Sequence, residues 1–258
     1  MEMLPALNNW DATKFSLHRA AKVIGAFRKA FSPPLPNALH LSLYIRDFGL
    51  TTGKLPFGEI ELHLADGRIC TMVGERGHDI SLGGANPAVL RAAMLAVLRD
   101  HGVSGDVPPI EDTAPFEIDA AQAADYLTAL WRITDALREL RADWLGSVTP
   151  LVVWPHGFDA SQLWFPGGNP DEAKLPHLAF GFSPGSAGLP RPYVYAYASP
   201  MPAGLPGTPL PDGTRWHDQD WSGVVIDYDT LRLRGPVEAE LAGTLRKVFT
   251  ILAERLGK

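Results

Sequence analysis

Side chains that can transfer protons or hold anions alternate with apolar ones between residues 39 and 46. His40, Tyr44 and Arg46 occupy even positions, whereas leucine or isoleucine occupies every odd one. This period of two predicts a half-buried strand that presents its even positions on one side. That side is either a solvent-exposed sheet surface or the wall of a cleft. In a cleft, Arg46 would anchor an anion and His40 would transfer a proton.

A second alternation places Tyr193, Tyr195 and Tyr197 on one side of a predicted strand. The intervening residues are valine and alanine, which are small enough to let a helix pack closely against their side. The tyrosines then face outward or into a groove. They form either a cross-strand ladder or a surface that binds an apolar or cyclic ligand through ring faces and hydroxyl groups. We expect them to line the same concave wall as residues 40–46.

Two imidazoles and a carboxylate, the donor types that hold iron or zinc, are available from His156, Asp159 and His177. Their spacing fits no single helix or tight hairpin, so surface histidines and acids in loops are the favoured interpretation. We predict no metal and no cofactor. The three side chains are kept as candidate ligand-binding residues, in which a histidine would move a proton if a reaction occurs.

Two short motifs lack a feature that their chemistry requires. The run Gly49–Leu55 has three residues between its glycines instead of four, and Leu55 stands where a phosphate loop needs Ser or Thr. We interpret it as a turn region. The run Gly181–Gly185 matches the hydrolase pattern G-x-S-x-G, but Pro184 has no backbone N–H to donate to an oxyanion. A serine nucleophile is therefore not predicted there.

No motif identifies a reaction, so no catalytic residue is assigned and enzymatic activity is left open. The prediction is a protein that binds a small organic ligand in a groove lined by aromatic and histidine side chains. The candidate ligand-binding residues are His40, Tyr44, Arg46, His156, Asp159, His177, Tyr195 and Tyr197. One alternative is a non-catalytic interaction or self-association module, and another is a metal-dependent enzyme.

The elements that must position these residues follow from hydrophobic periodicity. Apolar residues at spacings of three and four predict helices at residues 11–31, 87–102, 119–144 and 236–256. Alternating or continuous apolar runs predict strands at residues 39–45, 58–64, 68–73, 78–82, 150–155, 158–165, 177–183, 191–198 and 222–227. Short turns between several neighbouring strands predict mostly antiparallel pairing. The expected fold class is α+β, with antiparallel sheets and helices packed on one face of each sheet.

A polar, proline-rich connector at residues 103–118 predicts two halves, residues 1–117 and 118–258, within one compact unit. Each half has the order helix, strands, helix, so we predict an internal duplication. Arg28 and Arg141 occupy matching places near the end of a helix, one turn before an aromatic residue. For both arginines the favoured interpretation is structural. Each either extends past the apolar stripe to the helix end or bonds the last helix carbonyls.

The composition, with 46% hydrophobic and 20% charged residues, is typical of a soluble globular protein. The net charge of −6 argues against a nucleic-acid-binding surface, which would need a basic stripe. The single cysteine, Cys70, suits a reducing compartment. No signal-peptide pattern opens the chain, and no apolar run of about 18 residues could span a bilayer. We expect a cytoplasmic protein without a membrane partner, for which a homo-oligomer remains open.

Short segments spread over most of the chain carry a family resemblance. The earlier ones are Leu17-His18, Gly25, Arg28, Pro34, Asn37, His40, Leu43-Tyr44 and Gly49–Thr52. The later ones are Thr149-Pro150, Gly157–Asp159, His177, Ser183–Gly185 and Tyr195–Tyr197. Their order resembles an uncharacterised bacterial family, domain of unknown function 5996. The family pattern has tryptophans near positions 39 and 156 and a histidine near 152, where this chain has Leu39, His156 and Val152. The resemblance implies no activity, substrate or catalytic residue.

Overall fold

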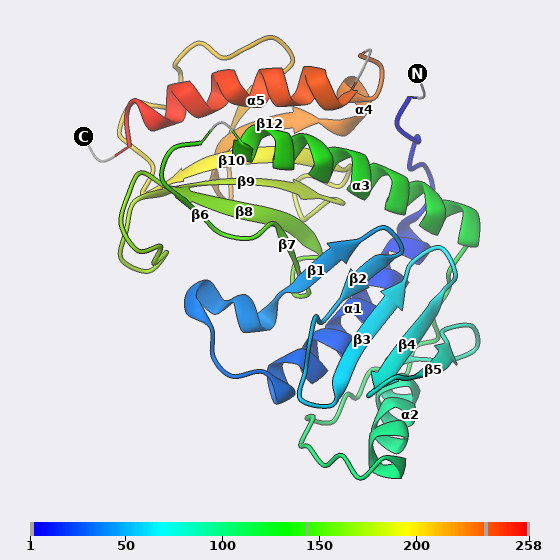
Figure 1. Ribbon diagram of the computed structural model, residues 1–258. Helices are drawn as coiled ribbons and strands as arrows, with labels where there is room; N and C mark the ends of the chain where they lie inside the picture. Colours follow the sequence, from blue (N-terminus) through cyan, green and yellow to red (C-terminus); the bar gives the residue numbers. More distant parts are fainter. Residues whose placement is uncertain (1–2, 143, 235–236, 257–258) are drawn as a thin grey trace. The chain divides into compact units, whose positions relative to one another are not determined.

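The computed structural model describes residues 3–142, 144–234 and 237–256. The chain folds into two compact units. Unit 1 comprises residues 1–6, 129–152 and 159–258, and unit 2 comprises residues 7–128 and 153–158. Each unit combines antiparallel strands with helices, so the chain is an α+β protein (Figure 1).

The first helix of unit 2, α1 (Asp11–Phe31), has the bounds that the sequence predicts. Leu17, Ile24 and Phe27 recur along one side of it and are fully buried. The helix ends at Phe31 because the residues that follow include a pair of prolines, which supply no amide hydrogen and restrict the residue before them. α1 packs against α2 and β3, so its apolar stripe forms part of the core of unit 2.

Side-chain caps set the start of the next two helices. The Asn86 side chain accepts a hydrogen bond of 2.9 Å from the first turn of α2 (Pro87–Asp100). Asp119 accepts one of 3.0 Å from the first turn of α3 (Ala120–Ala142). Both starts agree with the sequence prediction. α3 belongs to unit 2 up to residue 128 and to unit 1 from residue 129.

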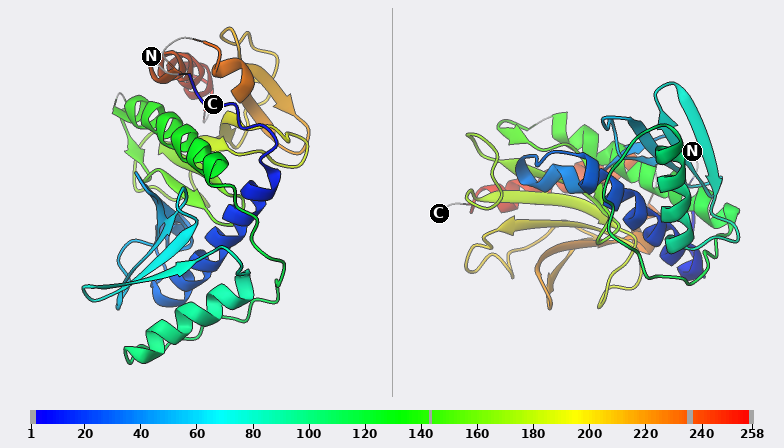
Figure 2. Two further views of the ribbon diagram at one scale, coloured as in Figure 1. Left: turned by 90° about the vertical axis from the view of Figure 1, so that its right-hand side faces the viewer. Right: turned by 90° about the horizontal axis from the view of Figure 1, so that it is seen from below.

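Each strand in the sheet of unit 2 pairs antiparallel with the next one along the chain. The strands are β1 (Leu43–Arg46), β2 (Gly49–Thr51), β3 (Gly58–His63), β4 (Arg68–Val73) and β5 (Arg76–Ser81). Leu50, Leu62 and Ile69 are partners across this sheet and are fully buried. α1 and α2 lie beside these strands (Figure 2) and cover the apolar face.

The strand predicted at residues 39–45 is wrong in its first half. The chain forms a short 3-10 helix, η1 (Pro36–Leu41), before β1 begins. The first residue of η1 is a proline, which has no amide hydrogen for strand pairing. Asn37 and Ala38 adopt left-handed conformations with φ of 50° and 52°, which no strand contains. His40 therefore lies on η1 and not on the strand.

Two helices complete unit 1: α4 (Tyr228–Leu231) and α5 (Val237–Ala253). The residues with which the predicted last helix opens, Gly235 and Pro236, lie outside the described residues. Arg132 on α3 donates two hydrogen bonds to the Glu238 carboxylate in the first turn of α5. This pair fixes the two helices to each other, and the carboxylate at the start of α5 is favourable for the helix dipole.

The strands of unit 1 are β6 (Ser147–Val148), β8 (Asp159–Phe165), β9 (His177–Ser183), β10 (Tyr193–Ser199), β11 (Arg215–Asp218) and β12 (Ser222–Asp227). β7 (Val152–Trp154) begins in unit 1 and ends in unit 2. The order in unit 1 is β11, β12, β10, β9, β8, with β6 on β8, and all these pairs are antiparallel. α3 and α5 cover one face of β8–β10 (Figure 1).

Three short strands lie outside the predicted strands: β2, β6 and β11. β2 occupies the start of the turn region predicted at residues 49–55. These strands have three, two and four residues. Such short segments carry too few residues for a clear period, and their partners in the sheet determine their conformation.

The internal duplication is not confirmed. Arg28 is 3% exposed, whereas Arg141 is exposed to solvent. The two arginines on which the proposed repeat depends therefore have different environments. The division into halves at residues 117 and 118 stays a prediction.

Candidate functional site

The strand register of unit 1 defines one sheet face, which we call the tyrosine face. It holds residues that are partners across neighbouring strands, on the side opposite α3 and α5. Its members are Asp159, Ser161, Leu163 and Phe165 on β8, His177, Ala179, Gly181 and Ser183 on β9, Tyr193, Tyr195, Tyr197 and Ser199 on β10, Gly223 and Val225 on β12, and Arg215 and His217 on β11. The predicted tyrosine row therefore lies on a surface to which several strands contribute.

The closest polar contact on this face joins Tyr195 to Asp159. The Tyr195 hydroxyl donates a hydrogen bond to Asp159 Oδ2 at 2.5 Å, and the Ser161 side chain also hydrogen-bonds to Tyr195. Gly181 is the strand partner of Tyr195, and a Cβ there would come within 2.3 Å of Tyr195 Cζ. Glycine at this position therefore leaves room for the ring to cross β9 and reach the carboxylate on β8.

Tyr195 and Tyr197 stay protonated at neutral pH. Burial raises the pKa of Tyr195 well above its usual value of 10, and the Asp159 carboxylate raises this pKa further. Burial also raises the pKa of Tyr197, and the charges of Asp159 and Glu172 add to the effect. The face thus combines hydroxyl donors, a carboxylate acceptor and aromatic ring faces.

Trp221 lies in the hairpin between β11 and β12, and its ring contacts all three tyrosines. The distance between ring centroids is 6.4 Å to Tyr193, 6.0 Å to Tyr195 and 6.3 Å to Tyr197. The His217 ring contacts the same indole at 4.7 Å. Tyr193 and Tyr195 are only 6% and 9% exposed. Tyr197 and Trp221 are half-buried, so these two rings are the parts of the cluster that solvent reaches.

His177 lies on the tyrosine face at the opposite end of β9 from Ser183. Its Nδ1 donates to the Leu175 carbonyl at 2.9 Å, and its ring packs against Phe165 at 5.4 Å. The imidazole is buried in these contacts, which indicates a structural role at the edge of the face.

In unit 2, Tyr44 contacts an arginine that the sequence did not assign to the site. The Arg28 guanidinium carbon lies 4.7 Å from the centroid of the Tyr44 ring. Its Nη2 donates to the Leu39 carbonyl at 3.0 Å and to the Tyr44 hydroxyl at 3.3 Å. Arg28 therefore holds η1 against β1, in place of the bonds to its own helix that the sequence predicts. Its Nε is buried without a hydrogen-bond partner among the described residues.

The other two residues of the predicted first wall lie apart on different elements. His40 is half-buried on η1, where its Nδ1 accepts a hydrogen bond from the Leu35 amide at 3.2 Å. Arg46 is exposed at the end of β1. Among the described residues, the structure gives no polar partner for the Arg46 side chain.

His156 contributes its backbone carbonyl to the packing of unit 2, and its ring lies 6.2 Å from the Trp154 ring. The Nε2 of His18 donates to the carbonyls of Pro155 at 2.9 Å and His156 at 3.1 Å. The His18 ring also stacks on Phe158 at 5.3 Å. Burial lowers the pKa of His18, and the charge of Lys22 lowers it further. The His156 side chain itself is exposed.

The structure divides the predicted site residues between the two units. Asp159, His177, Tyr195 and Tyr197 lie on the tyrosine face of unit 1, whereas His40, Tyr44, Arg46 and His156 belong to unit 2. A wall shared by both groups stays a prediction. The site prediction missed Ser161 and Trp221. Ser161 alternates with apolar and amide residues along β8, so period two could have found it, whereas the position of Trp221 depends on the fold of its hairpin.

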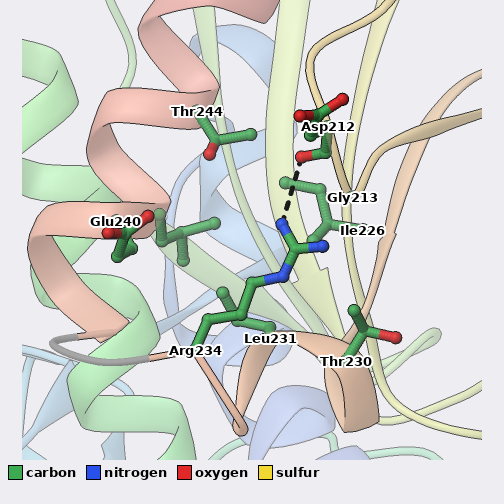
Figure 3. A pocket seen from close by; sticks show the side chains of 9 residues that line it. Asp212, Gly213, Ile226, Thr230, Leu231, Arg234, Glu240 and Thr244 are labelled. Carbon is green, nitrogen blue, oxygen red and sulfur yellow. Dashed lines mark hydrogen bonds between the residues drawn. The ribbon is translucent and has the colours of Figure 1, made fainter.

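Two cavities lie away from these residues. The one in Figure 3 has a volume of about 10 Å³, room for about one water. Arg234 borders it and donates to the Asp212 carbonyl at 3.1 Å. The other cavity, of about 210 Å³, lies between the turn at Gly67 and Phe116 in unit 2. Neither is lined by a predicted site residue. A ligand on the tyrosine face would therefore bind against a surface and would not fill one of these cavities.

Metal-donor side chains do not gather in the described part of the chain. Among residues 3–142, 144–234 and 237–256, no three His, Cys, Asp or Glu side chains are placed to hold one ion. His156 and His177 belong to different units. The structure therefore gives no donor set for the metal-dependent alternative.

Comparison with known families agrees with the resemblance in the sequence. A family model described as "Family of unknown function (DUF5996)" matches residues 3–257. The chain belongs to DUF5996. No curated protein and no solved structure matches this DUF5996 chain. No helix in the described ranges is long and apolar enough to cross a membrane.

Proposed function

We propose that this DUF5996 protein binds a small organic ligand on the tyrosine face of unit 1. The observation that carries the proposal is the hydrogen bond between Tyr195 and Asp159 within a cluster of aromatic rings. An aromatic surface with a few converging polar groups is the usual composition of a small-molecule site. The rings supply contact area, and the polar pair fixes the orientation of the ligand.

The accessible part of the face is the edge formed by Tyr197 and Trp221, which are both half-buried. Asp159 is half-buried too, and its charge influences both Tyr195 and Tyr197. A ligand that stacks on the Tyr197 and Trp221 rings would therefore approach the Asp159 carboxylate. Trp221 belongs to a short hairpin loop, so small shifts of this loop can adapt the surface to the ligand.

The self-association alternative requires exposed tyrosines. Tyr193 and Tyr195 are buried by unit 1 itself, with 6% and 9% exposure. Of the aromatic rings on this face, a second chain could contact Tyr197 and Trp221, whereas a stable interface buries roughly 800 Å² per partner. The burial of the row thus favours ligand binding over an interface.

A thermal-shift screen of small organic compounds tests the proposal, with Trp221→Phe as the site variant and Trp216→Phe as its control. Trp216 lies on the same hairpin, but its strand partner is Val224 on the opposite face. A ligand of the tyrosine face should stabilise the wild type and quench indole fluorescence. The shift should be retained in Trp216→Phe and the quenching reduced in Trp221→Phe. Equal quenching in both variants would place the ligand elsewhere.

A further inference from the structure

We infer that the ligand of the tyrosine face is an organic cation, such as a methylated or primary amine. This inference rests on the proposed function and names the chemical class of its ligand. It follows from two features that occur together on this face: aromatic rings that present several orientations, and a carboxylate at their edge.

The rings of Tyr195, Tyr197 and Trp221 contact one another in different orientations. Tyr195 and Tyr197 are nearly parallel, with an interplanar angle of 10° and centroids 6.2 Å apart. Trp221 lies across both, at 67° to Tyr195 and 62° to Tyr197. A ligand that contacts the faces of both the Tyr197 and Trp221 rings therefore meets two π systems of different orientation. Ring faces carry a partial negative charge that attracts ammonium groups.

Two carboxylates, Asp159 and Glu172, act on the Tyr197 hydroxyl. Asp159 accepts the Tyr195 hydroxyl proton, so its charge lies directly beside the rings. The charges of Asp159 and Glu172 both disfavour ionisation of the Tyr197 hydroxyl, which shows that negative charge is unfavourable at this position. A carboxylate or phosphate ligand would meet the same repulsion, whereas a cation would be attracted.

The arginine of this face, Arg215, and the nearby Arg191 are already engaged. Arg215 is paired with Asp227 at 2.9 Å, and Arg191 with Asp229 at 2.7 Å. In the described part of the chain, no Lys or Arg lies over the Tyr195, Tyr197 or Trp221 rings. The ring faces are thus free of the cation–π contacts that lysines and arginines make elsewhere in the protein.

A metal ion does not fit these groups, because the described residues offer no cluster of three donor side chains. A cation that carries methyl or methylene groups fits both features, since its apolar surface contacts the rings while its charge faces Asp159. Quaternary and methylated ammonium groups are the usual ligands of such aromatic sites.

The test uses isothermal titration calorimetry to compare the affinities of three probes that are similar in size and differ in charge. Choline is the cation, 3,3-dimethylbutan-1-ol is its neutral carbon isostere, and 3,3-dimethylbutanoate is an anion of similar size. We expect choline to bind about tenfold more tightly than the alcohol, in line with one cation–π contact and one nearby carboxylate. The anion should not bind measurably.

Variants test whether the preference for choline over the alcohol depends on the tyrosine face. Asp159→Asn should reduce choline affinity about tenfold and leave the alcohol unchanged. Asp135→Asn, an exposed carboxylate on α3, should change neither. If Asp159→Asn does not fold, Tyr197→Phe and Tyr197→Leu replace it: phenylalanine keeps the ring and should keep choline binding, whereas leucine should abolish it.

The outcomes separate the inference from the proposed function. Equal affinity for choline and the alcohol, or tighter binding of the anion, would overturn the cation assignment while ligand binding on this face still stands. Choline binding that survives both Asp159→Asn and Tyr197→Leu would overturn it as well. If the compound screen also gives no stabiliser that depends on Trp221, the proposed function fails together with this inference.

Discussion

At the scale of single residues, the Tyr195–Asp159 hydrogen bond joins β10 to β8 across β9. Replacement of Tyr195 by Phe removes the hydroxyl and leaves the half-buried Asp159 oxygen without this donor. We expect a loss of about 1–3 kcal/mol in unfolding free energy, measured by urea denaturation. Tyr193→Phe is the control. The Tyr193 hydroxyl bonds the exposed Ser186 at 3.0 Å, so removal of this hydroxyl should lower the unfolding free energy by less than about 1 kcal/mol. Equal losses would contradict the special role of Tyr195.

His18 gives unit 2 a predictable pH dependence. Its pKa is lowered by burial below the usual 6.5, so the unfolded chain binds a proton at higher pH than the folded one. The stability that neutral His18 contributes to the folded state is fully present above about pH 6.5 and decreases as the pH falls below that value. In His18→Gln the decrease should be smaller, as measured by unfolding free energies between about pH 5 and 8. Parallel pH curves for the two proteins would exclude His18 as its source.

At the scale of elements, two helical glycines should respond to alanine in opposite directions. A Cβ on Gly25 of α1 would lie 2.7 Å from Pro155 Cγ, so Gly25→Ala forces a rigid ring to move. We expect a net loss of about 1–2 kcal/mol, because overpacking outweighs the gain in helix propensity. A Cβ on Gly243 of α5 meets nothing within 4 Å, so Gly243→Ala should gain up to about 1 kcal/mol. Thermal denaturation of both variants decides whether the close approach to Pro155 exists.

Elements with strong local signals were predictable. α1 has its predicted bounds, and α2 and α3 begin within one residue of the predicted starts, where Asn86 and Asp119 cap them. The alternation at residues 193–197 correctly indicates that the tyrosines share a face. These features depend on neighbours within a few residues, which the sequence displays directly.

Elements that depend on distant partners were not predictable. η1 takes the place of the first half of the expected strand, and Arg28 on α1 holds it through the Leu39 carbonyl, a contact between separate segments. Asn37 and Ala38 adopt left-handed conformations although neither is a glycine, so no glycine in the sequence indicates them. Trp221 joins the tyrosine face only because its hairpin folds back over the sheet.

At the scale of the whole molecule, the first residues of the chain belong to the unit built mainly from the last ones. The Tyr228 hydroxyl donates to the Pro5 carbonyl at 2.7 Å, and Arg191 donates to the Ala6 carbonyl at 2.9 Å. Leu4 is 1% exposed. The two units are thus interleaved along the chain and do not follow one another.

The neighbouring residues Met3 and Leu4 test this arrangement. Leu4→Ala should reduce the free energy of unfolding by about 2–5 kcal/mol, because it creates a cavity at a buried position. Met3 is 59% exposed, so Met3→Ala should change stability by no more than about 0.5 kcal/mol. Guanidinium denaturation of both variants provides the measurement. A Leu4→Ala protein as stable as Met3→Ala would show that the N-terminal segment is not part of the unit 1 core.

The interleaving also determines when the protein can finish folding in a cell. Residues 3–6 are synthesised before unit 2, whereas their partners Arg191 and Tyr228 are made after residues 7–128. Most of unit 2, residues 7–128, is complete long before that point. Residues 4–6 therefore cannot make these contacts until residue 228 has been translated, and unit 1 reaches its native state only after residues 7–128 of unit 2 have been made.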